Sequence, residues 1–200
     1  MKILIPTCKD RSEIDSQICE IFENTPGADI FSSCTKASAS VNRNMCLDQI
    51  QAGEVAIMID DDITGFYPGW DTDLAKPLED ESFFAVSARL LNKDGKFGQT
   101  CSACYEPSPD LIEIKLHGHC VMPTAAIAFR YKGIRFDEAG YAGSGFEDDD
   151  WFCEHVKSFP ELRYAQSNAC SLCHLNEMKN QKGKFWDHNI KYFREKWGKL

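Results

Sequence analysis

Apolar residues in the first sixty positions form three short runs. They cover residues 2–6, 29–34 and 54–59. Runs of this length, bounded by proline, glycine or charged residues, predict β-strands. The third run, Glu-Val-Ala-Ile-Met-Ile, is almost uninterrupted, which is typical of a strand buried on both faces of a parallel sheet.

The segments between these runs have the spacing of amphipathic helices. Ile14, Ile18 and Ile21 recur every three or four residues, so we expect a helix with Ser12 as its N-cap that stops at Thr-Pro-Gly, residues 25–27. A second helix is predicted at residues 40–52. The resulting order of strand, helix, strand, helix and strand is that of a nucleotide-binding α/β unit, in which ligands gather at the carboxyl ends of the strands.

The second half of the chain has fewer clear patterns. We expect strands at residues 83–91 and 120–131 and a helix at 147–159, whereas residues 97–119 match no pattern. A final helix is predicted from apolar residues at helical spacing, namely Trp186, Ile190, Phe193 and Trp197. The expected fold class is α/β, in one domain, with a mostly parallel central sheet flanked by helices.

Composition narrows the class of protein. At 200 residues, 43% of them hydrophobic, the chain suits one globular domain. A net charge of −9 disfavours duplex nucleic acid as a partner. The apolar run at the start is interrupted by Pro6 and is too short for a signal peptide or membrane span. Ten cysteines are best tolerated as reduced thiols, so we expect a cytoplasmic protein without a membrane span.

An acidic triplet, Asp60-Asp61-Asp62, follows the third apolar run directly. Carboxylates at the rim of a sheet lose part of their hydration, and a bound cation offsets that loss. Hard oxygen ligands favour Mg²⁺ or Mn²⁺, which retain open positions for diphosphate oxygens. The alternative is a solvated acidic turn in which Asp62 caps the next segment.

A second acidic cluster follows a glycine-containing loop. Gly143-Ser144-Gly145-Phe146 leads into Glu147-Asp148-Asp149-Asp150 at the start of the predicted helix. One or two of these acids would be explained by favourable interaction with the helix N-terminus. Four in succession raise one another's pKa and could also supply a general base for an acceptor hydroxyl.

The combined pattern resembles the inverting glycosyltransferases of the A-type fold, especially glycosyltransferase family 2 and the β-1,4 galactosyltransferases. The resemblance covers about 190 residues and rests on six features in order: Ile3-Leu4-Ile5-Pro6-Thr7, Asn42-Arg43-Asn44, the acidic triplet as a DXD motif, Phe136-Asp137-Glu138, Gly145-Phe146-Glu147-Asp148-Asp149-Asp150, and His174. It implies that residues 1–92 bind a nucleotide sugar and residues 93–200 bind the acceptor. The strand that ends in Ser32-Ser33-Cys34-Thr35 lacks the Asp-rich turn that holds uracil in many family 2 members, which leaves the donor base open.

The resemblance also implies roles for individual residues. We expect the nucleotide sugar to be a UDP-sugar. It would be bound by Pro6, Thr7, Arg11, Arg43, Asp60 and Asp61. Mn²⁺ or Mg²⁺ would be bound by Asp62 and His174, with Asp60 as a further candidate ligand. Asp148 would be the catalytic base and Glu147 would bind an acceptor hydroxyl. The metal would stabilise the departing diphosphate while Asp148 removes the acceptor proton, with inversion at the anomeric carbon.

Two C-x-x-C pairs provide a rival site. Cys101 with Cys104 and Cys170 with Cys173 have the ligand count of a structural Zn²⁺ site, although 66 residues separate the pairs. Paired reduced thiols are the simpler interpretation.

Two other functions therefore stay open. One is a zinc-stabilised, non-catalytic module with a nucleotide-sugar fold. The other is a sugar nucleotidyltransferase, although Cys8-Lys9-Asp10-Arg11 lacks the glycines of a triphosphate-binding loop. The acceptor is open among a glycan, a lipid-linked sugar, a protein and a modified base. The sequence indicates no oligomeric state.

Overall fold

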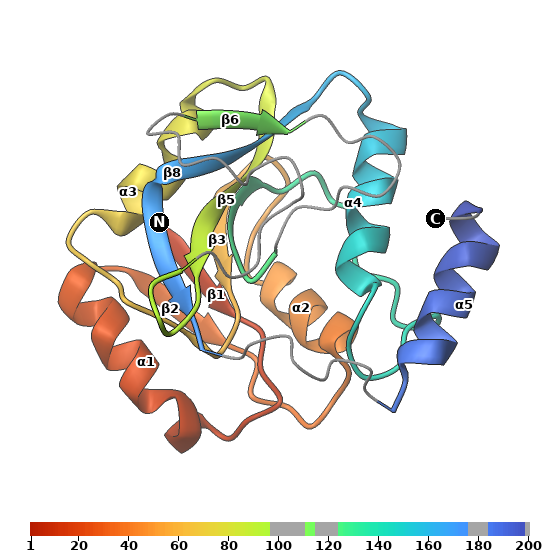
Figure 1. Cartoon of the computed structure of the whole chain (residues 1–200), viewed down its shortest axis with the longest axis horizontal. Helices are drawn as coiled ribbons and strands as arrows, with labels where there is room; N and C mark the ends of the chain where they lie inside the picture. Colours follow the sequence, from red (N-terminus) through yellow and green to blue (C-terminus); the bar gives the residue numbers. More distant parts are fainter. Residues whose placement is uncertain (97–110, 115–123, 176–183, 199–200) are drawn as a thin grey trace.

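A computed structural model describes residues 1–96, 111–114, 124–175 and 184–198. Two layers of helices enclose a mixed sheet (Figure 1). The elements in chain order are β1 (Lys2–Ile5), α1 (Arg11–Asn24), β2 (Asp29–Ser32), α2 (Ala39–Leu47), β3 (Val55–Ile59), β4 (Ile63–Thr64), α3 (Trp70–Ala75), the 3₁₀-helix η1 (Lys76–Glu79), β5 (Phe83–Leu91), β6 (Leu111–Ile114), β7 (Ala126–Arg130), α4 (Glu147–Ser158), β8 (Arg163–His174) and α5 (Trp186–Trp197).

The sheet has the strand order β2-β1-β3-β7-β5-β8-β4, with β6 paired to β8. Strands β1, β2 and β3 are parallel, as predicted. Beyond β3 the sheet is mixed and differs from the expected mostly parallel arrangement: β5 pairs parallel with β8, but β7 pairs antiparallel with both β3 and β5, and β4 and β6 pair antiparallel with β8. An apolar run buried on both faces has the same pattern in either direction, so the sequence did not reveal this reversal.

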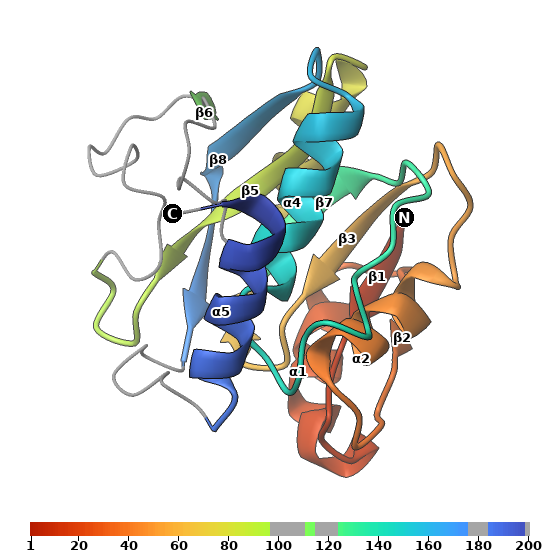
Figure 2. The same cartoon turned by 90° about the vertical axis from the view of Figure 1, so that its right-hand side faces the viewer.

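Alternate residues of each central strand face opposite layers of the molecule. Ile3 and Ile5 of β1 join the core beneath α1 and α3, whereas Leu4 joins the core beneath α2 and α4. The same alternation separates Ile57 and Met58 in β3. Helix α5 lies outside α4 and forms an additional layer at that edge (Figure 2).

The first two helices begin slightly earlier than predicted. Asp10, not Ser12, is the N-cap of α1, and the carboxylate of Glu13 accepts a hydrogen bond of 2.7 Å from the Asp10 backbone N–H. This reciprocal arrangement is a capping box two residues upstream of the predicted one. Ser38 caps α2, whose last residue is Leu47, so the second helix is shorter than the predicted 40–52.

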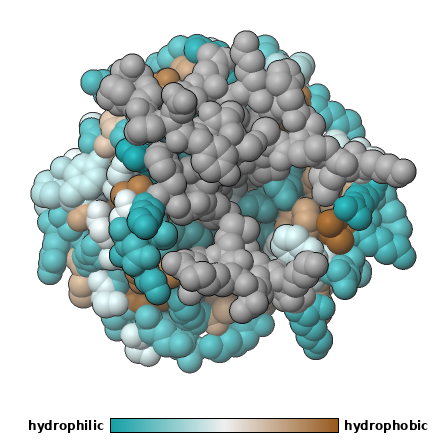
Figure 3. Space-filling model, in the orientation of Figure 1, coloured by the Kyte–Doolittle hydropathy of each residue, from teal (hydrophilic) through white to brown (hydrophobic). Residues whose placement is uncertain are grey.

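The described surface facing the viewer in Figure 3 is mainly hydrophilic, with small separate hydrophobic patches. Among the described residues, the exposed large apolar side chains are Met1, Phe22, Leu111, Leu175 and Phe185. None of the described helices combines the length and apolar character needed to cross a bilayer. The cysteines in the described ranges are all free thiols.

Candidate active site

Asp60, Asp62 and His174 come together where β3 ends. Each offers one ligand atom, and these atoms lie within 4.8 Å of one another. Backbone hydrogen bonds fix both segments: Asp60 N–H donates to the Ala125 carbonyl over 2.7 Å, and Leu175 N–H donates to the Asp62 carbonyl over 3.0 Å. His174 enters the cluster because β8 pairs with β4, with Ile63 opposite His174.

The electrostatics of this cluster favour a cation. Burial raises the pKa of Asp60, with the charge of Arg43 opposing that shift and the charge of Asp62 adding to it. Burial lowers the pKa of His174, but the hydrogen bond and charge of Asp62 outweigh it, so the pKa ends above its ordinary value. Two crowded carboxylates and an imidazole form a donor set that suits Mn²⁺ or Mg²⁺.

The middle residue of the triplet points elsewhere. The carboxylate of Asp61 accepts a hydrogen bond from the Thr7 hydroxyl, and it lies 2.7 Å from Nζ of Lys9. Asp61 therefore ties the segment after β1 to the segment after β3. Its carboxylate is engaged by the protein itself, although the residue still lies at the rim of the pocket described below.

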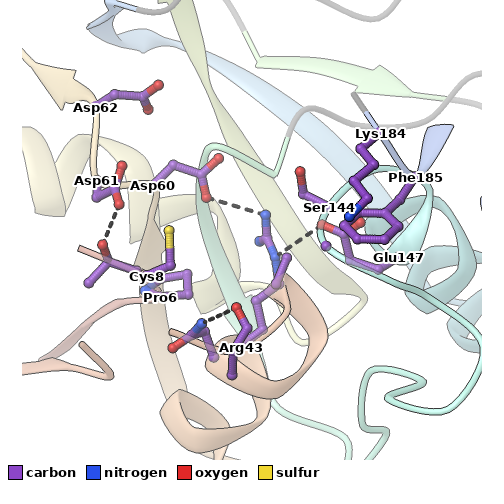
Figure 4. Close-up of a pocket in the computed structure, with 15 residues that line it drawn as sticks. Pro6, Cys8, Arg43, Asp60, Asp61, Asp62, Ser144, Glu147, Lys184 and Phe185 are labelled. Carbon is purple, nitrogen blue, oxygen red and sulfur yellow. Dashed lines mark hydrogen bonds and ion pairs between the residues drawn. The ribbon is translucent and has the colours of Figure 1, made fainter. Parts of the chain in front are cut away.

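Arg43 of α2 connects the two acidic clusters (Figure 4). Nη2 of Arg43 lies 3.3 Å from Oδ1 of Asp60, and Nε lies 3.7 Å from Oε1 of Glu147. The residue is only 6% exposed. Burial lowers the pKa of Arg43, but Asp60, Glu147 and Asp148 together raise it, so the guanidinium stays charged. One buried cation thus balances carboxylates from β3 and α4.

Two further motif segments contact each other. The Asn44 side chain donates to the Phe136 carbonyl over 2.9 Å and to Glu138 over 2.7 Å, and it accepts from the Phe136 N–H over 2.9 Å. Phe136 in turn stacks on Trp151 of α4, with ring centroids 5.0 Å apart. Residues 42–44 and 136–138 therefore meet to fix α2 against α4.

The glycine-containing loop brings Glu147 to the pocket. Phe146 has a φ of 69°, in the left-handed region that non-glycine residues seldom adopt, and it immediately precedes α4. Glu147 is 3% exposed, and its carboxylate accepts a hydrogen bond from the Gly145 N–H. Burial and the charge of Asp148 raise the pKa of Glu147 to about 7, against the opposing charge of Arg43.

The three aspartates that follow have different environments. Asp148 accepts a hydrogen bond of 3.0 Å from the Thr124 hydroxyl. Burial, together with the charges of the neighbouring acids, raises the pKa of Asp149 to about 8. Asp150 is 1% exposed and accepts hydrogen bonds from Lys196 Nζ and Trp197 Nε1 of α5. Of the four acids, Glu147 therefore lines the cavity described below and Asp148, which does not line it, is held by Thr124. Asp149 favours the protonated form, and Asp150 anchors α5.

A cavity of about 500 Å³ lies between these groups, with the ends of β1 and β3 on one side and α2 and the loop before α4 on the other. The predicted residues that line it are Pro6, Thr7, Arg43, Asp60, Asp61, Asp62 and Glu147. Arg11 does not line it. The Arg11 guanidinium donates to Ser32 Oγ over 2.8 Å and pairs with Asp15 over 3.4 Å on the exposed side of α1.

Lys184 and Phe185 also line this cavity, and sequence reasoning missed both. They lie across the cavity from the acidic triplet, above Ser144 and Glu147 (Figure 4). A Lys-Phe pair before a predicted helix carries no distinguishing signal, because only the packing of α5 brings it to the site.

The described half of the possible zinc set does not form a ligand pair. Cys101 and Cys104 lie outside the described residues. Cys170 and Cys173 are both in β8, where positions three apart point to opposite faces of the sheet. Cys170 is fully buried in the hydrophobic core, and Cys173 is partly exposed. The two thiols therefore do not converge on one metal ion.

The fold is that of the A-type glycosyltransferases. No family model matches the sequence, and a search of curated proteins finds no match. Solved structures do match: GalNAc-T7 with UDP, GalNAc and Mn²⁺ has a TM-score of 0.59 and 11% identity over 96% of this chain and 41% of that one. The chain therefore spans less than half the length of GalNAc-T7.

Two further structures match over longer parts of their own chains. Glucosyl-3-phosphoglycerate synthase from Mycobacterium tuberculosis, with Mg²⁺ and UDP, has a TM-score of 0.56 and 14% identity over 100% of this chain and 79% of that one. A mycobacterial protein has a TM-score of 0.62 and 13% identity over 100% of this chain and 75% of that one. Identities at this level establish the shared fold alone.

Proposed function

We propose that this protein is a metal-dependent glycosyltransferase that moves a sugar from a nucleotide diphosphate, with UDP as the first candidate, to a hydroxyl acceptor. The observation that carries the proposal is the convergence of Asp60, Asp62 and His174, of which Asp60 and Asp62 also line the 500 Å³ cavity. The fold adds support, because GalNAc-T7 and the mycobacterial synthase were solved with UDP and a divalent cation.

Asp60, Asp62 and His174 would hold Mn²⁺ or Mg²⁺. When bound, such an ion would neutralise negative charge that develops on a departing diphosphate. Pro6 and Thr7 lie where β1 ends and would contact the base and ribose. Arg43 would contact the donor from α2, since its guanidinium already faces Asp60. Asp61 would shape the pocket through Thr7 and Lys9.

Asp148 is the proposed general base. The Thr124 hydroxyl orients one carboxylate oxygen of Asp148, and the Asp149 N–H donates to the other over 3.0 Å. Glu147, directed by Arg43 and the Gly145 N–H, would bind an acceptor hydroxyl. Asp148 would remove the proton as the hydroxyl attacks the anomeric carbon from the face opposite the diphosphate. The configuration at that carbon would therefore be inverted. A glycan, a lipid-linked sugar, a protein and a modified base are all compatible with these roles.

A donor screen tests the proposal. Purified protein is mixed with UDP-, GDP- and dTDP-sugars, and both thermal stabilisation and release of nucleoside diphosphate are measured with Mn²⁺ and with chelator. We expect one donor class to stabilise the protein, by about 2.7 kcal/mol at 100 times its Kd, and to be hydrolysed slowly with Mn²⁺ only. If no donor stabilised the protein and no donor was hydrolysed, the proposal would be refuted.

Two additional measurements, an assay with nucleoside triphosphates and metal analysis of the purified protein, separate the other two functions. Pyrophosphate release from a nucleoside triphosphate and a sugar 1-phosphate would identify a nucleotidyltransferase. One tightly held zinc per chain without UDP affinity would identify a non-catalytic module.

A further inference from the structure

Asn189 of α5 is fully buried against the loop that precedes α4. Its Nδ2 donates to the carbonyls of Ala142, Ser144 and Gly145 over 2.9, 3.3 and 3.0 Å. Its Oδ1 accepts from the Ala142 N–H over 3.0 Å. Both sides of one amide are thus used to hold a single loop, and the two N–H hydrogens serve three carbonyls.

Aromatic residues of α5 hold the next position of the same loop. The Phe146 ring packs on Trp186 and Phe193, with centroid distances of 4.8 and 5.7 Å. This packing supports a backbone conformation that costs about 1 kcal/mol or more for a residue with a Cβ. Because Phe146 directly precedes Glu147, α5 determines where the acidic end of α4 begins (Figure 2).

The donor side of the loop has a separate anchor. The carbonyl of Gly143, which lines the cavity, accepts a hydrogen bond of 2.7 Å from the Ala39 N–H at the start of α2. That bond does not involve α5. Loss of the Asn189 contacts should therefore release residues 144–146 while Gly143 stays attached to α2.

We infer that Asn189 is a positioning residue for glycosyl transfer: its amide fixes the loop at residues 142–145, which places Glu147 against Arg43 and sets the start of the turn that presents Asp148. This inference rests on the proposed function. Asn189 contacts neither acid, so it acts through the loop backbone. Its hydrogen bonds involve neither the proposed metal ligands nor Pro6 and Thr7, so its loss should affect transfer more than nucleotide binding.

The test replaces Asn189 with Asp and with Ala. Asn189→Asp keeps the size of the side chain but turns an oxygen toward the three carbonyls, whereas Asn189→Ala removes every contact. Lys191→Ala is the matched control, because Lys191 is 76% exposed on the same helix and pairs with Glu195. For each protein, UDP affinity with Mn²⁺ is measured by calorimetry and kcat is measured with the donor found in the screen.

We expect kcat to fall about 100-fold in both Asn189 variants, the loss expected from a displacement of about 1 Å at a reacting group. UDP affinity should change less than about threefold, and Lys191→Ala should match wild type. Unchanged kcat would overturn the inference. Parallel loss of UDP affinity and kcat would also overturn it, because Asn189 would then support the whole site. A wild-type protein that binds UDP but transfers no sugar would instead refute the proposed function, and the inference with it.

Discussion

Nε2 of His174 lies 3.2 Å from Oδ2 of Asp62, although 112 positions separate the two residues in the chain. The antiparallel pairing of β4 with β8 produces this contact, because it places Ile63 directly opposite His174. Asp62 immediately precedes β4 and His174 is the last residue of β8, so two backbone segments position the pair. A metal site at this point is therefore supported by the sheet and does not depend on a single loop.

Replacing the proposed base should separate chemistry from binding. In Asp148→Asn the side chain keeps its size and still accepts from Thr124, but it cannot take a proton. We expect transfer to fall at least about 1,000-fold, at the stronger end of general-base effects, while UDP affinity with Mn²⁺ changes less than about threefold. Steady-state kinetics and calorimetry on the same preparation measure both.

The adjacent acid supplies the control for that experiment. Burial and neighbouring charges raise the pKa of Asp149 to about 8, so the neutral form already predominates near pH 7. Asp149→Asn should therefore retain transfer within about fivefold of wild type. If Asp149→Asn abolished transfer and Asp148→Asn did not, the two roles would be reversed.

The raised pKa of Asp149 also predicts how stability depends on pH. An unfolded Asp has a pKa of about 3.9, so between about pH 4 and 8 the folded protein holds a proton that the unfolded chain releases. This contribution to stability is complete below about pH 4 and is lost as pH rises through 8, at about 1.4 kcal/mol per pH unit for one proton. Glu147, with a pKa of about 7, adds a contribution of the same sign.

Asp149→Asn should consequently flatten the pH profile. Between about pH 5 and 8, the free energy of unfolding should decline less in the variant than in wild type. Denaturant unfolding at several pH values measures the difference. Parallel profiles for the two proteins would show that Asp149 titrates alike in the folded and unfolded states.

The contact between Asp150 and α5 should stabilise the fold. Asp150 is buried and binds both Lys196 and Trp197. Removing one partner of a buried pair costs about 3–5 kcal/mol, and we expect about 2 kcal/mol for Asp150→Ala because Lys196 remains partly exposed. Thermal unfolding should show a Tm lower by about 4–8 °C.

Glu195→Ala is the matched control for this change, because Glu195 is 64% exposed on α5. It should alter stability by less than about 0.5 kcal/mol. Equal losses in both variants would mean that the buried position of Asp150 contributes nothing beyond surface charge.

The first half of the fold could be predicted because its signals are local. The spacing of Ile14, Ile18 and Ile21 predicts one buried helix face, and the uninterrupted apolar run before Asp60 predicts a buried strand. Strand direction is not local, so the reversal at β7 was missed. Helix α3 and strand β4 were missed because segments of six and two residues are too short to show a period.

The candidate site was predictable where residue chemistry alone marks a position. Asp60 and Asp62 were named from their type and their place after a buried strand, whereas His174 was named only from the family resemblance, and the three residues converge. Side-chain direction was not predictable, since three consecutive aspartates look equivalent in sequence while Asp61 points to Thr7 and Lys9. Arg11 does not line the cavity, whereas Lys184 lines it and was missed, because tertiary packing decides which cation reaches the cavity.

We propose above all that Asp60, Asp62 and His174 bind a divalent cation that in turn supports nucleotide binding. The most direct test of this proposal is calorimetric titration of UDP into wild type and Asp62→Asn, each with Mn²⁺ and with chelator. Glu79→Gln, which changes an exposed carboxylate on η1, is the control and should behave as wild type. We predict that Mn²⁺ strengthens UDP binding at least about tenfold in wild type and less than about twofold in Asp62→Asn. Equal enhancement by Mn²⁺ in both proteins, or none in wild type, would contradict the account.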